Sequence, residues 1–156
     1  LVQQVMTDAT VRTATQNQVT YSDTIKGWYI NLPVSGERIT GVPMLEDGIL
    51  LFTTIVPSAS PCDFGGRGFA NALDFLTGSM LAFPAFDINR NRVLSLDDGL
   101  SDGVEIGFSV GGGTRIRGSA DDLLVSSRAD GTLVPTTTAK GYTGLRGRIT
   151  WREFIQ

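Results

Sequence analysis

The stretch 49–78 constrains the fold of this chain most, because it contains two strand-like runs separated by a connection rich in proline and glycine. The first run, residues 49–56, is apolar and β-branched, and its length suits a β-strand. The second run, residues 69–76, alternates along its length and closes on a Thr-Gly turn signal. The connection is expected to be an irregular loop, because it contains Pro57, Pro61, Gly65, Gly66 and Gly68.

The rest of the chain repeats this pattern of short strands and turns. Its 156 residues include 19 glycines, and only 19% are charged, which favours turns over long helices. Residues 1–26 are polar and are predicted to form an extended lead-in. Further strands are expected at residues 28–32, 38–42, 44–45, 104–110, 114–117, 122–127, 133–134 and 146–154.

These patterns predict an all-β fold of short antiparallel strands, as a single domain over 1–156 or as a fragment of a larger one. Turn signals every 8 to 12 residues or so are typical of a sandwich, a barrel or a propeller. A propeller blade takes about 40 to 50 residues, so the chain has room for roughly three blades. The large aromatic residues in the apolar runs are expected to pack in the core: Trp28, Phe52, Phe75, Phe108 and Trp151.

Composition argues against several classes of function. The chain contains no histidine, so a Ser/His/Asp system would lack its base and the commonest zinc ligand is missing. A net charge of -3 does not suit a protein that binds nucleic acid. No apolar run reaches the roughly 18 to 20 residues of a membrane-spanning helix. We therefore predict no enzymatic activity, no nucleic-acid partner and no membrane span.

The segment 87–98 has the spacing of a calcium-binding loop. Oxygen-bearing side chains fall at its first, third, fifth, ninth and twelfth positions, and an apolar residue falls at its eighth. Side-chain oxygens would bind the ion directly or through water, and the seventh residue would offer its backbone carbonyl. The candidate metal ligands are Asp87, Asn89, Asn91, Val93, Ser95 and Asp98.

The same loop departs from the calcium pattern at its centre. The sixth position, normally glycine for the sharp turn, is Arg92, and the fifth is the neutral Asn91. The alternative is a loop that keeps its turn and has lost the metal, with Arg90 or Arg92 paired to Asp87 or Asp98. Calcium binding is therefore expected to be weak or absent.

Three longer segments carry a family resemblance: GWYINLPVSGERIT, TTIVPSASPCDFGGRGFANALDFLTG and the terminal GRITWREFIQ. They resemble the C-terminal propeller region of the PilY family, large proteins associated with the tip and assembly of type IV pili. The likeness covers most of the chain. It implies a fragment of a modified β-propeller made of C-terminal blades. PilY proteins also carry a calcium loop of this general kind, so the resemblance and the spacing at residues 87–98 agree.

The resemblance also implies a function and a location. The chain would belong to a type IV pilus biogenesis factor and tip adhesin that supports pilus assembly, twitching motility and surface attachment. Its place would be the periplasm, the outer membrane or the cell surface at the pilus tip. The implied partners are minor pilins, the upstream part of the same protein, and a host or surface ligand.

Two points stay open at this stage. The single cysteine, Cys62, is either a free thiol or half of a bridge to a residue outside this sequence, and an oxidising periplasm would favour the bridge. The alternative function is part of a quinoprotein-like propeller enzyme, suggested by the strand ending LDFLTG. The absence of histidine and of a converging acid and base favours the pilus protein over that enzyme.

Overall fold

The computed structural model describes residues 1–60, 65–108 and 112–141, and these residues form three β-sheets. The strands are β1 (Val2–Val5), β2 (Val11–Arg12), β3 (Trp28–Asn31), β4 (Arg38–Ile39), β5 (Met44–Glu46), β6 (Ile49–Pro57), β7 (Gly66–Asp74), β8 (Gly103–Glu105), β9 (Gly113–Ile116), β10 (Asp122–Ser127) and β11 (Leu133–Thr138). One short 3-10 helix, η1 (Leu96–Asp98), is the only helix of the described part. Within that part, no helix is long and apolar enough to cross a membrane.

The central sheet has six strands and is built on the β6–β7 hairpin. Its order is β2-β8-β7-β6-β4, and β5 also pairs with β6. All of its pairs are antiparallel. The turn from β5 into β6 lies at Asp47 and Gly48, a turn-forming pair whose φ angles of 49° and 82° suit a tight hairpin. The β9–β10–β11 sheet is antiparallel as well.

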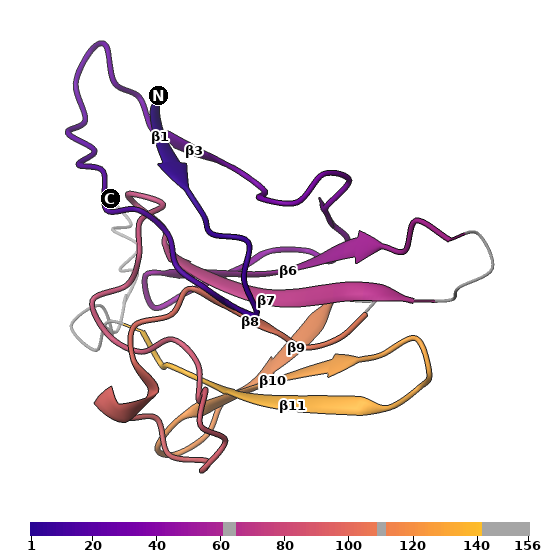
Figure 1. Ribbon diagram of the computed structural model, residues 1–156. Helices are drawn as coiled ribbons and strands as arrows, with labels where there is room; N and C mark the ends of the chain where they lie inside the picture. Colours follow the sequence, from indigo (N-terminus) through magenta and orange to yellow (C-terminus); the bar gives the residue numbers. More distant parts are fainter. Residues whose placement is uncertain (61–64, 109–111, 142–156) are drawn as a thin grey trace, which may run out of the picture.

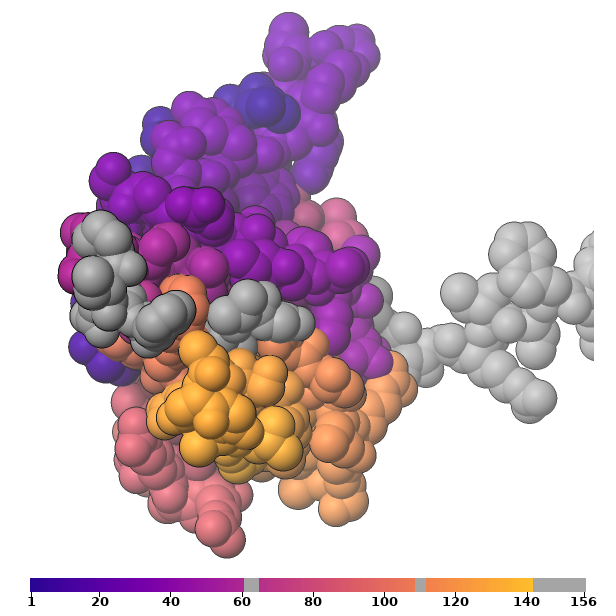
Figure 2. Space-filling view, turned by 90° about the vertical axis from the view of Figure 1, so that its right-hand side faces the viewer, coloured from indigo at the N-terminus to yellow at the C-terminus, as the bar shows by residue number. Residues whose placement is uncertain are grey.

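The three sheets form three layers, with the central sheet in the middle (Figure 1). The two-stranded β1–β3 sheet lies on one side of it, and the β9–β10–β11 sheet lies on the other. Figure 2 shows the same division from the side, with the purple N-terminal third above the orange and yellow residues of β9 to β11. The all-β prediction is confirmed, with one difference: β1 and β3 pair in parallel.

Each face of the central sheet has its own apolar core. Ile49 and Leu51 of β6 face a cluster that includes Phe86 and Leu124, whereas Leu50 and Phe52 belong to a second cluster. Successive side chains of a strand point to opposite faces. A strand that is covered on both faces is expected to be mostly apolar, and this explains why residues 49–56 are apolar apart from the buried Thr53 and Thr54.

The predicted irregular loop is shorter than expected, because β6 continues to Pro57 and β7 already begins at Gly66. Pro57 and Gly66 are paired residues at the end of the hairpin. A Cβ atom at Gly66 would lie 2.1 Å from the Val56 carbonyl oxygen, so glycine lets the two backbones approach. The prediction that Gly66 excludes a strand is therefore wrong: glycine weakens a strand but also marks such close approaches.

The strand expected at residues 104–110 ends early, since β8 stops at Glu105. Gly107 has a φ of 80°, which is outside the strand region and accessible mainly to glycine. The Ile106 carbonyl accepts a hydrogen bond from Arg128 Nε at 3.0 Å instead of from a neighbouring strand. A contact with a distant residue therefore overrides the local alternation of apolar side chains.

The lead-in of residues 1–26 carries β1, β2 and a fully buried arginine. The Arg12 guanidinium binds Glu37 at two points, with N···O distances of 2.6 and 3.0 Å, and both side chains are fully buried. The guanidinium carbon also lies 3.3 Å from the centroid of the Phe69 ring. Together these contacts tie the lead-in to the centre of the molecule.

Asp102 makes a second polar connection to the lead-in. Its two carboxylate oxygens accept hydrogen bonds from the backbone N–H groups of Ala14, at 2.6 Å, and Leu81, at 3.1 Å. The residue is fully buried. Burial raises the pKa of Asp102 to about 6, although the two N–H donors act in the opposite direction.

This raised pKa predicts a stability that falls as the pH rises from about 4 to about 6. The folded state holds the Asp102 proton more tightly than the unfolded chain does. The stabilisation from this proton is therefore complete below the ordinary pKa of 3.8, which applies to the unfolded chain, and it is lost as the pH rises through about 6, the pKa in the folded state. The stabilisation amounts to about 3 kcal/mol, because each pKa unit of difference corresponds to about 1.36 kcal/mol. Urea unfolding across this range should show a flatter profile for Asp102→Asn than for the parent. Parallel profiles would contradict the assignment.

Candidate functional site

The predicted calcium-binding segment is a loop that leaves the core at Phe86 and ends in η1. Phe86 is fully buried and forms an isolated antiparallel bridge with Thr138 of β11. The Asp87 N–H then donates to the Thr137 carbonyl at 3.2 Å. These contacts fix the start of the loop beside the outer edge of β11.

Side-chain oxygens of the first half of the loop accept hydrogen bonds from its own backbone. Asp87 Oδ1 accepts from Asn91 N at 3.2 Å, and Asp87 Oδ2 accepts from Arg92 N at 2.7 Å. Asn89 Oδ1 accepts from Asn91 N at 3.0 Å, and Asn91 Oδ1 accepts from Val93 N at 2.7 Å. The first, third and fifth positions therefore hold the backbone in a tight coil around their oxygens.

Asp98 closes the loop from its other end. Its Oδ1 accepts from Ile88 N at 3.0 Å and from Asn89 N at 3.2 Å, and its Oδ2 accepts from Ser95 N at 2.9 Å. Ser95 is the N-cap of η1, and its hydroxyl accepts from Asp97 N. The twelfth position thus returns to the second and third, which brings Asp87, Asn89, Asn91, Ser95 and Asp98 into one loop.

Two arginines of the loop adopt the left-handed backbone conformation: Arg92 at the sixth position, where the calcium pattern places glycine, and Arg90 at the fourth. Arg90 has a φ of 61° and Arg92 a φ of 66°. Outside glycine this conformation costs about 1 kcal/mol or more per residue. Among the residues that the structure describes, neither guanidinium pairs with Asp87 or Asp98, and Arg92 reaches Asp87 through its backbone N–H. The alternative in which an arginine replaces the ion through a salt bridge is therefore wrong for these residues.

The loop carries the ligand types of a hard-cation site but little negative charge. Carboxylate and amide oxygens are the ligands that calcium prefers, and the loop carries them in order. Only Asp87 and Asp98 among the candidate ligands bear a negative charge. Within the described residues, no three His, Cys, Asp or Glu side chains gather as a metal site.

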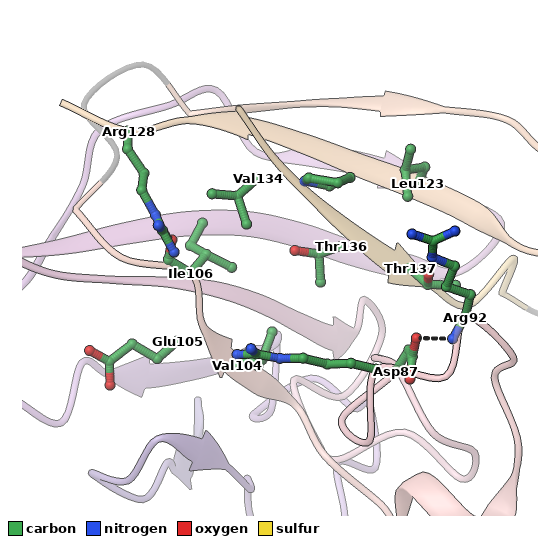
Figure 3. Close-up of a pocket in the computed structure, with 12 residues that line it drawn as sticks. Asp87, Arg92, Val104, Glu105, Ile106, Leu123, Arg128, Val134, Thr136 and Thr137 are labelled. Atoms are coloured by element: carbon green, nitrogen blue, oxygen red, sulfur yellow. Dashed lines mark hydrogen bonds between the residues drawn. The ribbon is translucent and has the colours of Figure 1, made fainter. Parts of the chain in front are cut away.

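A pocket of about 630 Å³ opens between this loop, β8, β10 and β11 (Figure 3). Sequence reasoning missed it, because no local pattern joins segments that are so far apart in the chain. Its apolar lining comes from Val104, Ile106, Leu123, Val134 and Pro135. Its charged lining comes from Asp87, Arg90, Arg92, Glu105 and Arg128.

Comparison with known proteins shows which proteins this layered all-β fold resembles. No family model matches the chain. It is 34% identical over 98 residues to the type IV pilus biogenesis factor PilY1 of Pseudomonas aeruginosa strain PAO1, and equally so to that of strain PAK. This match covers 56% of this chain and 8% of each relative. PilY1 of strain UCBPP-PA14 is 27% identical over 133 residues, 81% of this chain and 11% of that protein.

A solved structure matches the fold. The crystal structure of the Pseudomonas aeruginosa PilY1 C-terminal domain superposes with a TM-score of 0.66 and 23% identity, over 88% of this chain and 31% of that one. The chain is similar in sequence to part of the PilY1 proteins, and it shares the β-propeller-like fold of the PilY1 C-terminal domain. This confirms the family resemblance seen in the sequence. The chain spans only about a tenth of the length of the curated relatives it matches.

Several predicted features lie outside the described residues. Cys62 falls in the segment 61–64, and the strand expected at 146–154, with Trp151, falls in 142–156. Of the other predicted core aromatics, Phe52 is 4% exposed, whereas Trp28, Phe75 and Phe108 are only half-buried. The fully buried aromatic residues of the described part are Phe69 and Phe86.

Proposed function

We propose that this chain is a non-enzymatic part of a type IV pilus biogenesis factor that supports pilus assembly, twitching motility and surface attachment. The observation that carries the proposal is the 34% identity to the PilY1 proteins, which are named as such factors. The likeness of the fold to the PilY1 C-terminal domain supports it. The site of action is outside the cytoplasm, in the periplasm, at the outer membrane or on the cell surface at the pilus tip.

The proposed partners follow from the same relationship. A segment that spans about a tenth of its relatives' length is expected to act together with the upstream part of its own protein. Minor pilins and a host or surface ligand are the further partners that we propose.

The alternative of a quinoprotein-like propeller enzyme receives less support. Both carboxylates that line the pocket already have partners: Asp87 accepts from the loop backbone, and Glu105 pairs with Arg67 at 3.3 Å. A general base needs a free carboxylate within reach of its substrate. Extraction of the purified chain with solvent, followed by a search for quinone, separates the two functions, because an enzyme of that class would release the cofactor.

Deletion of the gene segment that encodes this chain, in its own bacterium, tests the proposal. We expect fewer surface pili by electron microscopy and smaller twitching zones, both restored by the parent segment. The control is a Lys26→Ala strain, since Lys26 is exposed and forms only a surface ion pair. Normal piliation and normal twitching after the deletion would contradict the proposed function.

We further propose that the loop at residues 87–98 binds calcium weakly. Two carboxylates give a low ligand charge, and the left-handed Arg92 places a positive side chain where glycine is usual. Calorimetry of the parent chain is expected to give a dissociation constant of about 10⁻⁴ to 10⁻³ M, or no binding. Arg92→Gly relieves the backbone strain and removes a positive charge, so it is expected to tighten binding about tenfold.

Asp87→Ala is the matched control for calcium, because it removes the first ligand of the loop. It is expected to abolish the binding gained in Arg92→Gly. Submicromolar binding by the parent chain would show that Arg92 is no obstacle. Equal heats for Arg92→Gly and for Arg92→Gly with Asp87→Ala would show that any calcium binds elsewhere.

A further inference from the structure

The pocket described above combines an apolar floor with arginines at its rim. Ile106, at 2% exposure, lies in the floor, and Val134 of β11 lies beside it. Figure 3 shows Arg128 at one end of the pocket, next to Ile106, and Arg92 at the other end, next to Thr137. Arg90 also lines it. A ligand seated over Val134 therefore has a positive charge at either end.

The positive charges of the pocket have few partners in the described part of the chain. The guanidinium groups of Arg90 and Arg92 make no hydrogen bond or ion pair with the residues described there. Arg128 uses Nε to bind the Ile106 carbonyl, which orients the group and leaves its two terminal nitrogens for a ligand.

The negative charges at the same pocket are already engaged. Glu105 forms an ion pair with Arg67, at 3.3 Å, and Arg67 in turn also pairs with Asp8. Asp87 accepts from two backbone N–H groups of its own loop. Three arginines against two carboxylates give the lining a net positive charge, which is complementary to an anion.

The edge of β11 that lines the pocket is not suited to pairing with an added strand. The Thr137 carbonyl faces away from β10, because it accepts from Asp87. Residues two apart in a strand point their backbone groups the same way, so the backbone of Pro135 also faces the pocket. Proline has no N–H to offer there, and proline on an edge strand blocks pairing. Recognition must therefore come from side chains and not from a strand ladder.

We propose that this pocket binds an acidic segment of a partner protein, in which two carboxylates flank an apolar side chain. The apolar side chain rests on Ile106 and Val134, and the carboxylates pair with Arg128 at one end and with Arg90 or Arg92 at the other. Guanidinium groups hold carboxylates through two parallel hydrogen bonds. A volume of about 630 Å³ is within the usual range for a small ligand site and accommodates a few residues.

The test uses the full 156-residue chain and a fluorescein-labelled peptide with the core Glu-Val-Glu, in buffer with EDTA so that no calcium occupies the neighbouring loop. Fluorescence anisotropy should detect binding that weakens as salt is added. Peptides with the cores Gln-Val-Gln and Glu-Ser-Glu should each bind about tenfold more weakly, because one lacks the charges and the other lacks the apolar side chain.

Variants of the chain locate the binding. Arg90→Gln with Arg92→Gln is expected to weaken binding of the Glu-Val-Glu peptide about tenfold. The melting temperature should not change, because the two guanidinium groups make no hydrogen bond or ion pair with the described residues. Arg128→Gln should weaken it by a similar factor. The matched control is Arg38→Gln, an exposed arginine of β4 at the far side of the central sheet, which should leave the affinity unchanged.

Three outcomes would overturn the proposal. They are equal binding of the Gln-Val-Gln peptide, unchanged affinity in the Arg90 and Arg92 double variant, and displacement of the peptide by inorganic phosphate at equal concentration. The last would show a general anion site that ignores the apolar floor. None of these outcomes depends on the role proposed for the chain in pilus biogenesis.

Discussion

Glu37→Ala is expected to destabilise the chain by about 3 to 5 kcal/mol, because it leaves the Arg12 guanidinium buried without its counter-charge. Both side chains of the pair are fully buried and joined at two points. The remaining contacts of Arg12, with the Phe69 ring and with Asn71 Oδ1 at 3.4 Å, are too weak to replace a carboxylate. Urea unfolding followed by tryptophan fluorescence measures the loss.

A double replacement separates the buried charge from the fold itself. Arg12→Met with Glu37→Leu removes both charges and keeps apolar volume, so most of the stability lost in Glu37→Ala should return. The matched control is Asp23→Ala, which breaks the exposed pair with Lys26 and should cost less than about 1 kcal/mol. A double variant as unstable as Glu37→Ala would mean that the shape of the pair, and not its charge, holds the lead-in.

Phe52→Ala is expected to cost about 3 to 5 kcal/mol, as truncations of fully packed phenylalanines do. Phe52 is 4% exposed and lies in the second apolar cluster with Met6, Ala14 and Leu73. Loss of its ring would leave a cavity between the central sheet and the lead-in. Urea unfolding gives the change in free energy, and near-ultraviolet circular dichroism reports on Trp28, which packs against the same cluster.

Leu45→Ala provides the control for this truncation. Leu45 belongs to β5 of the same sheet but is 61% exposed, so its loss should change stability by less than about 1 kcal/mol. A loss below about 1 kcal/mol for Phe52→Ala would place that ring at a surface that is available to a partner.

The candidate site was predicted from the sequence in part. The loop at residues 87–98 was found because its polar side chains lie within twelve positions, and the hydrogen bonds among Asp87, Asn89, Asn91 and Asp98 follow from that spacing. The pocket beside it was not found. It joins the loop to β8 and β11, and nothing in the local spacing of Ile106 or Val134 indicates that they meet.

The sequence alone determined where most strands lie, since a strand and its hairpin neighbour depend on residues close together in the chain. The apolar run of β6, the turn at Asp47 and Gly48, and the position of β10 all follow from such local patterns. Only the tertiary structure decided which residues of the polar lead-in are buried, namely Gln4, Met6, Arg12 and Ala14. Arg12 meets Glu37 across 25 residues and Asn71 across 59, and a buried charge is stable only where such distant partners converge.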